Sequence, residues 1–169
     1  MNQRFPRAFF VLLAAGASIH FGRAYPLLTP VMASHFDAHG IANGWETKQR
    51  FFEIFGELTV LSAILVFGLA KLIGVMPVKF INLPNKQYWL AAGQRDASIS
   101  YLGAWFAWYG CAVYVVILTA FDYAVQTNLH APQAIGPARL WFTLAFFAGF
   151  TIYWTVLLFR RFGRAPSVV

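Results

Sequence analysis

Ionisable side chains gather at one end of the apolar segments of this 169-residue chain. Glu53 and Glu57 are four residues apart, so they share one face of a helix, and Arg50 lies on nearly the same face. Counting back about 20 residues from Lys71 places both carboxylates near the outer boundary of the hydrocarbon layer. The same depth is predicted for four further groups, which are His20, Arg23, Asp122 and Arg139.

Charged groups at that depth are costly unless they pair or face water, so they are candidates for a functional site. One hypothesis is a polar cavity that opens outward. The other is that Arg23, Arg50 and Arg139 extend to the lipid headgroups while the carboxylates begin above the boundary. The sequence leaves both open. It also leaves the protonation of Glu53 and Glu57 open, because desolvation raises a carboxyl pKa and a nearby cation lowers it.

A polar segment between the first two apolar segments carries His35, Asp37 and His39. Together with Glu53 and Glu57, these side chains are of the types that bind Zn²⁺. However, histidines four residues apart bind one ion readily only on a helix, and this segment is predicted to be a loop. We therefore expect no metal and no other cofactor, and we expect His35 and Asp37 to shape the loop through hydrogen bonds to its backbone.

Glycines determine the predicted shape of this loop. Gly40 and the Asn43-Gly44 pair tolerate positive φ angles, so the loop is expected to turn back tightly and to roof the outward cavity. The candidate ligand-binding residues on this outer face are His35, Asp37, His39, Glu53, Glu57, Arg23 and Arg139.

Two runs of sequence resemble a known family. The loop reads HFDAHGIANGWETK from His35 to Lys48, and a second run reads INLPNKQYWL from Ile81 to Leu90. Both resemble segments that follow the first and second helices of SdpI-like bacterial integral-membrane proteins. The residues after the second run, Ala91 to Arg95, differ from the Pro-Glu-Arg-Arg type of continuation in that family. The resemblance implies a multi-span membrane fold and a role in toxin immunity or signalling, in a family that is largely of unknown function. The matching positions in the first run are His35, Phe36, Asp37, Gly40, Asn43, Gly44, Trp45, Thr47 and Lys48.

Composition indicates a membrane protein, because 59% of the residues are hydrophobic and only 11% are charged. A soluble domain is about 45–50% apolar. We predict one all-α domain over residues 1–169, an antiparallel bundle of four transmembrane helices. The spans are expected at about 5–27, 51–74, 99–121 and 137–159. The first span is long and lacks a small-residue cleavage site, so it is expected to remain as a signal-anchor.

Basic residues predict the orientation. Nine of the thirteen Lys and Arg residues lie before the first span, around the central loop or after the fourth span. By the positive-inside rule, both termini and the central loop face the cytoplasm, in a multi-pass protein of the bacterial cytoplasmic membrane. These residues are spread over helix ends and do not form one basic face, so nucleic acid is not an expected partner.

No sequence signature of catalysis is present: GxSxG, HExxH, CxxC and a phosphate-binding glycine loop are all absent. We therefore predict a non-enzymatic protein that recognises a ligand or peptide at its extracytoplasmic face, as a sensor or immunity protein. The alternative is an accessory structural subunit of a respiratory, photosynthetic or transport complex, and a small proton-coupled transporter is a third hypothesis. The expected partners are the lipid bilayer and either a larger membrane complex or a second copy of the chain.

Overall fold

The computed structural model describes residues 2–131 and 136–164. Within these ranges, four helical rods are each long and apolar enough to cross a membrane. The first is α1 (Arg4–Ala24) with the short η1 (Tyr25–Leu27), and the second joins α2 (Lys48–Ala63), the π-helical η2 (Ile64–Gly68) and α3 (Leu69–Val75). The third is α5 (Arg95–Leu129) and the fourth is α6 (Ala138–Phe162).

The predicted spans fall on these rods, but the third rod is longer than predicted. At 35 residues, α5 runs eight residues beyond the expected end at Phe121. Its length of about 52 Å exceeds the hydrocarbon thickness of about 30 Å. Hydropathy falls at Asp122, but no proline or glycine follows before residue 132, so the helix continues as a polar extension.

The prediction that the fold is all-α was wrong in one respect. Residues between the first two rods form a two-stranded antiparallel sheet, made of β1 (Val31–Phe36) and β2 (Ala42–Thr47). Val31 pairs with Thr47, Met32 with Glu46 and Ala33 with Trp45, and an irregularity near His35 shifts the register beyond that point. The predicted loop is therefore a β-hairpin.

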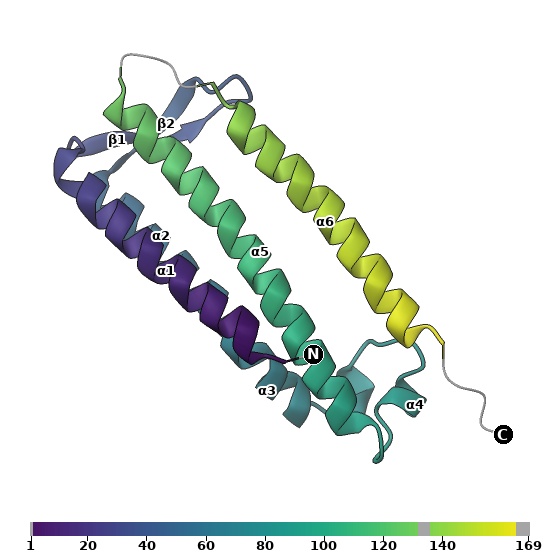
Figure 1. Cartoon of the computed structure of the whole chain (residues 1–169). Coiled ribbons are helices and arrows are strands. Elements are labelled where there is room, and N and C mark those ends of the chain that lie inside the picture. The colour runs from purple at the N-terminus through teal and green to yellow at the C-terminus, as the bar shows by residue number, and fades with distance from the viewer. Residues whose placement is uncertain (1, 132–135, 165–169) are drawn as a thin grey trace.

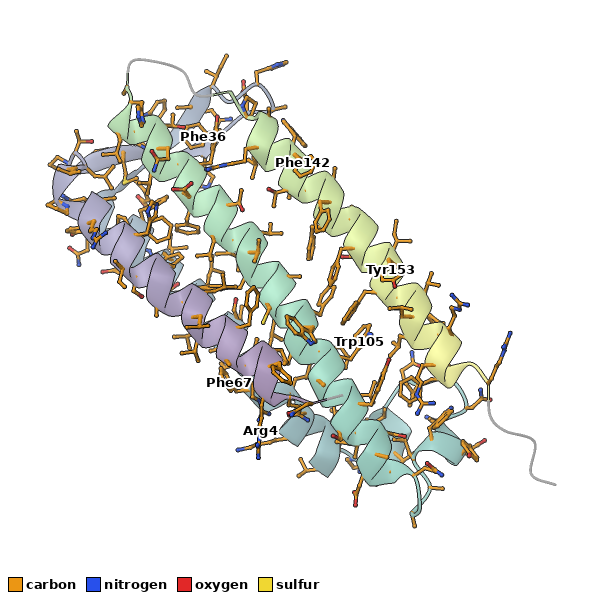
Figure 2. All side chains as sticks on the ribbon, viewed as in Figure 1. Arg4, Phe36, Phe67, Trp105, Phe142 and Tyr153 are labelled. Atoms are coloured by element: carbon orange, nitrogen blue, oxygen red, sulfur yellow. The ribbon has the colours of Figure 1, made fainter. Side chains whose placement is uncertain are left out.

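Helix α5 lies at the centre of the arrangement (Figure 1). It packs against α1, α2, η2 and α3 on one side and against α6 on the other. The core between α1, α2 and α5 is rich in aromatic rings, including Phe10, Phe21, Phe55 and Tyr114. Aromatic side chains also project into the space between α5 and α6, where Trp105 and Trp154 stack with ring centroids 5.5 Å apart (Figure 2).

The hairpin and the remaining short elements occupy opposite ends of the rods (Figure 1). The 3-10 turn η3 (Val78–Phe80) and the short α4 (Lys86–Trp89) lie at the end where α1 begins and α6 finishes. A second apolar cluster forms there from Ile73, Ile81, Leu83, Trp89, Leu90, Leu102 and Phe162.

Candidate functional site

A cavity of about 370 Å³ lies beneath the β-hairpin, between the strands and the adjoining ends of α2 and α5. That volume is within the range of about 300–1,000 Å³ common for small-molecule sites. The hairpin contributes polar and aromatic groups, and the helices contribute mainly apolar ones. The lining residues are Ser34, His35, Trp45 and Glu46 from the hairpin, with Phe51, Ile54, Ala120, Phe121 and Ala124 from the helices.

The tip of the hairpin is fixed by Asp37. Its Oδ1 atom accepts hydrogen bonds from the backbone N–H groups of Ile41, at 2.9 Å, and of His39, at 2.8 Å. The Gly40 N–H donates to the Asp37 carbonyl oxygen at 3.0 Å, and Gly40 has a φ of 82°. The predicted loop-shaping role of Asp37 is thus confirmed. The N–H groups of Ile41 and His39 also hold the pKa of Asp37 below its ordinary value.

This lowered pKa predicts that the hairpin tip loosens in acid. The ionised Asp37 stabilises the folded turn at neutral pH, and that stabilisation is lost as the pH falls through the folded-state pKa, below the ordinary aspartate value of 3.8. Amide hydrogen exchange at Ile41 should therefore accelerate in that acid range, beyond the intrinsic pH dependence of exchange. In Asp37→Asn, which does not titrate there, the protection of Ile41 should stay constant, and an identical acid response in the variant would contradict the prediction.

Asn43 and Gly44 do not make the predicted turn. Both lie in β2. Among the glycines that the structure describes, only Gly40 has a positive φ. Gly44 instead pairs with His35 across the sheet, where a Cβ atom would lie 3.0 Å from the Cβ of His35. Gly44 thus leaves room for the imidazole, whose Nδ1 is 3.0 Å from the Oγ of Ser34.

The base of the hairpin is joined to the helices by polar side chains. Lys48 Nζ donates to the carbonyl oxygens of Tyr25 and Leu28, each at 3.1 Å, at the end of the first rod. Thr47 caps the start of α2 by accepting from the Arg50 N–H. These contacts give structural roles to Thr47 and Lys48, the last residues of the first sequence run that resembles the SdpI-like family.

Asn128 on the polar extension of α5 holds the other strand. Its side-chain amide accepts from the Ala33 N–H at 2.9 Å and donates to the Ala33 carbonyl oxygen at 2.8 Å, as a neighbouring strand would. Sequence reasoning missed Asn128, because the third span was expected to end at Phe121. It would have been found by extending that helix through the polar residues 122–129.

The predicted outer charges form two separate groups. On α2, Arg50 Nη1 lies 2.9 Å from Glu57 Oε1 and 3.4 Å from Glu53 Oε2. The expectation that these charges pair is thus confirmed for Glu57. However, Glu53 and Glu57 are 47% and 63% exposed and do not line the hairpin cavity. That cavity carries His35 and also Glu46, a carboxylate that sequence reasoning missed because Asn43 and Gly44 indicated a turn and not a strand.

The second group joins three helices. Asp122 on α5 accepts from Arg139 on α6, and its Oδ1 lies 2.8 Å from His20 Nε2 on α1. Gln126 also donates to Asp122, at 3.3 Å. Arg139 therefore belongs to this ionic junction and not to the hairpin cavity. The other candidates, Arg23 and His39, are both exposed and lie at the hairpin end of the molecule. Across the described ranges, no group of three His, Cys, Asp or Glu side chains is placed to hold a metal ion.

Asp122→Ala is expected to lower the free energy of unfolding by about 2 kcal/mol, because it leaves His20 and Arg139 without their shared acceptor. Guanidinium- or SDS-induced unfolding in detergent micelles would measure the change. Glu57→Gln is the control, since its partly exposed pair should contribute about 0–1 kcal/mol. Equal losses in the two variants would contradict a junction role for Asp122.

The second family-like run contacts the end of α6. Asn85, in the left-handed region with a φ of 50°, and the indole of Trp89 both donate to the Phe162 carbonyl oxygen, at 2.9 and 3.0 Å. The Arg161 guanidinium lies 4.8 Å from the centroid of the Trp89 ring. Farther along, Arg95 donates to two carbonyl oxygens at the end of α3. This run therefore has a structural role, remote from the hairpin cavity.

Comparisons of the chain with protein-family models, with characterised proteins and with solved structures find no match.

Proposed function

We propose that this chain is a non-enzymatic, SdpI-like integral membrane protein that recognises a ligand or peptide in the cavity beneath its hairpin. The observation that carries the proposal is the cavity itself. Its roof belongs to the first family-like run, and its lining combines His35 and Glu46 with the apolar residues of α2 and α5. Such a mixture of apolar surface and a few convergent polar groups is typical of ligand sites.

The way in which the hairpin is held supports recognition. Asp37 fixes the tip of the hairpin, Lys48 holds its base, and Asn128 holds strand β1. A roof held in this way loses little conformational freedom when a ligand binds, and that lowers the entropic cost of binding.

The proposal includes an antiparallel bundle of four transmembrane helices in the bacterial cytoplasmic membrane, with both termini in the cytoplasm. The hairpin lies at one end of the helices, and the start of α1, α4 and the end of α6 lie at the opposite end (Figure 1). Most basic residues belong to the end that contains α4, and this supports a cytoplasmic location for that end. Single cysteines at the exposed positions Ala38 and Gln87, on a Cys111→Ala background, should react with an impermeant maleimide from opposite sides of the membrane. Reaction of both from the same side would overturn the orientation.

Photocrosslinking in intact cells tests recognition. A benzoylphenylalanine in place of Trp45, which is 62% exposed at the cavity, is expected to give a discrete adduct with an extracytoplasmic peptide or small molecule. The matched control is the same probe in place of Phe142, which is 73% exposed on α6 and away from the cavity (Figure 2). If both positions crosslink only to lipid, the recognition proposal fails.

One observation favours the accessory-subunit function as a second candidate. In the most apolar 18-residue stretch of α6, no residue is buried within the described structure. Exposed aromatic side chains cover this helix, including Trp141, Phe142, Phe146 and Tyr153. Crosslinking from Phe142 to another membrane protein, without a specific adduct at Trp45, would favour this function over ligand recognition.

A further inference from the structure

We infer that the hairpin cavity binds an ammonium or guanidinium group on an apolar stem, as presented by a lysine or arginine side chain of a peptide. The inference rests on the proposed recognition function and specifies its ligand class. It begins with Glu46, which lines the cavity and is partly buried. Glu46 pairs across the sheet with Met32, which is 1% exposed, so the two side chains lie on the face of the hairpin that covers the helices.

The carboxylate of Glu46 has no hydrogen-bond or ion-pair partner within residues 2–131 and 136–164. The two basic residues that follow it in the chain are engaged elsewhere. Lys48 donates to backbone carbonyls of the first rod, and Arg50 pairs with the carboxylates of α2. A partly buried carboxylate is stabilised by a cation, and the residues that line this cavity include His35 but no lysine or arginine.

Aromatic rings beside Glu46 favour the same kind of ligand. Trp45 lines the roof, and Phe51 and Phe121 line the floor with ring centroids 4.7 Å apart. The faces of such rings attract ammonium and guanidinium groups. Ile54 and Ala124 complete an apolar surface on which an aliphatic stem can lie.

A peptide side chain fits this lining better than a lipid headgroup does. The amine of an aminophospholipid lies close to its phosphate, so its entry would bring a second negative charge toward Glu46. The stem of lysine or arginine is uncharged and would contact Phe51, Ile54 and Phe121 instead. The charges and the apolar floor therefore favour the peptide.

Two probes with the same aliphatic stem test the inference on the whole chain in detergent micelles. Nα-acetyl-lysine amide carries the ammonium group, and Nα-acetyl-norleucine amide has the same stem without it. Binding would be followed by ¹⁹F NMR of protein labelled with 5-fluorotryptophan, with the Trp45 resonance assigned from a Trp45→Phe sample. We expect saturable binding of the lysine probe, at least tenfold tighter than that of the norleucine probe.

Two variants locate the charge that is responsible. Glu46→Gln, which keeps the shape of the side chain, should weaken the lysine probe at least tenfold. Glu53→Gln, on the exposed face of α2, should change its affinity less than twofold. Equal binding of the two probes, an unchanged affinity in Glu46→Gln, or tighter binding of phosphoethanolamine than of the lysine probe would overturn the inference.

The proposed function can be judged separately. A specific crosslink from position 45 in cells, combined with failure of the lysine probe, would overturn the cationic ligand class and leave recognition standing. The absence of both results would overturn the two proposals together.

Discussion

Replacing Trp89 with alanine is expected to lower the free energy of unfolding by about 3–5 kcal/mol, the usual loss when a buried tryptophan is removed. Trp89 is 6% exposed, packs edge-to-face on Phe162 and donates its indole N–H to the Phe162 carbonyl oxygen at 3.0 Å. Chemical unfolding in micelles, followed by circular dichroism, would measure the loss.

The conservative variant Trp89→Phe separates packing from hydrogen bonding. It keeps a ring against Phe162 but removes the indole donor, so a loss of about 1–2 kcal/mol is expected. Tyr153→Ala is the surface control, because Tyr153 is 61% exposed on α6 (Figure 2). A loss from Trp89→Ala no larger than that from Tyr153→Ala would show that α4 does not secure the end of α6.

Replacing Gly40 with alanine is expected to destabilise the hairpin by about 2–3 kcal/mol. Its φ of 82° is a strained conformation for alanine, and the new Cβ would lie 2.5 Å from the Tyr123 hydroxyl and 3.2 Å from Pro137 Cδ. Because the hairpin roofs the cavity, the proposed ligand site should be disrupted too. Hydrogen exchange at the amides of β1 and β2 would report the loss more directly than global unfolding.

Gly56→Ala provides the matched control for that substitution. Gly56 lies within α2, and a Cβ added there meets no atom within 4 Å. Alanine at this helical position should raise stability by about 0.5–1 kcal/mol. If hydrogen exchange at the amides of β1 and β2 were as slow in Gly40→Ala as in Gly56→Ala, the prediction that the hairpin depends on the close contacts of its tip would be wrong.

The four apolar rods could be predicted because hydropathy over a membrane-length window is a strong, local signal. The hairpin could not be predicted in the same way. Its strands are short, lack clean alternation and contain Asn43 and Gly44, which are uncommon in strands and usual in turns. Contacts that join residues distant in the sequence, such as those of Asn128 with Ala33, hold the hairpin in place, and local preferences do not reveal them.

The chemistry of individual residues was predicted better than their grouping. Pairing of Glu57 with an arginine followed from the cost of an isolated charge near lipid. The structure also places these charges toward the hairpin end of the helices, but position along a helix does not give the direction in which each helix face points. That rotation is set by packing against α5, and it separates the charges of α2 from the junction at Asp122.

The unbroken length of α5 has a mechanical consequence. One end of this helix holds β1 through Asn128, and at the other end Arg95 holds the last carbonyls of α3. Helix α5 is continuous over 35 residues and contains no proline, whereas the second rod contains the π-helical turn η2, where a helix can bend. Any displacement of β1 would therefore act on α5 through Asn128 and could reach the α3 end of this helix, some 50 Å away.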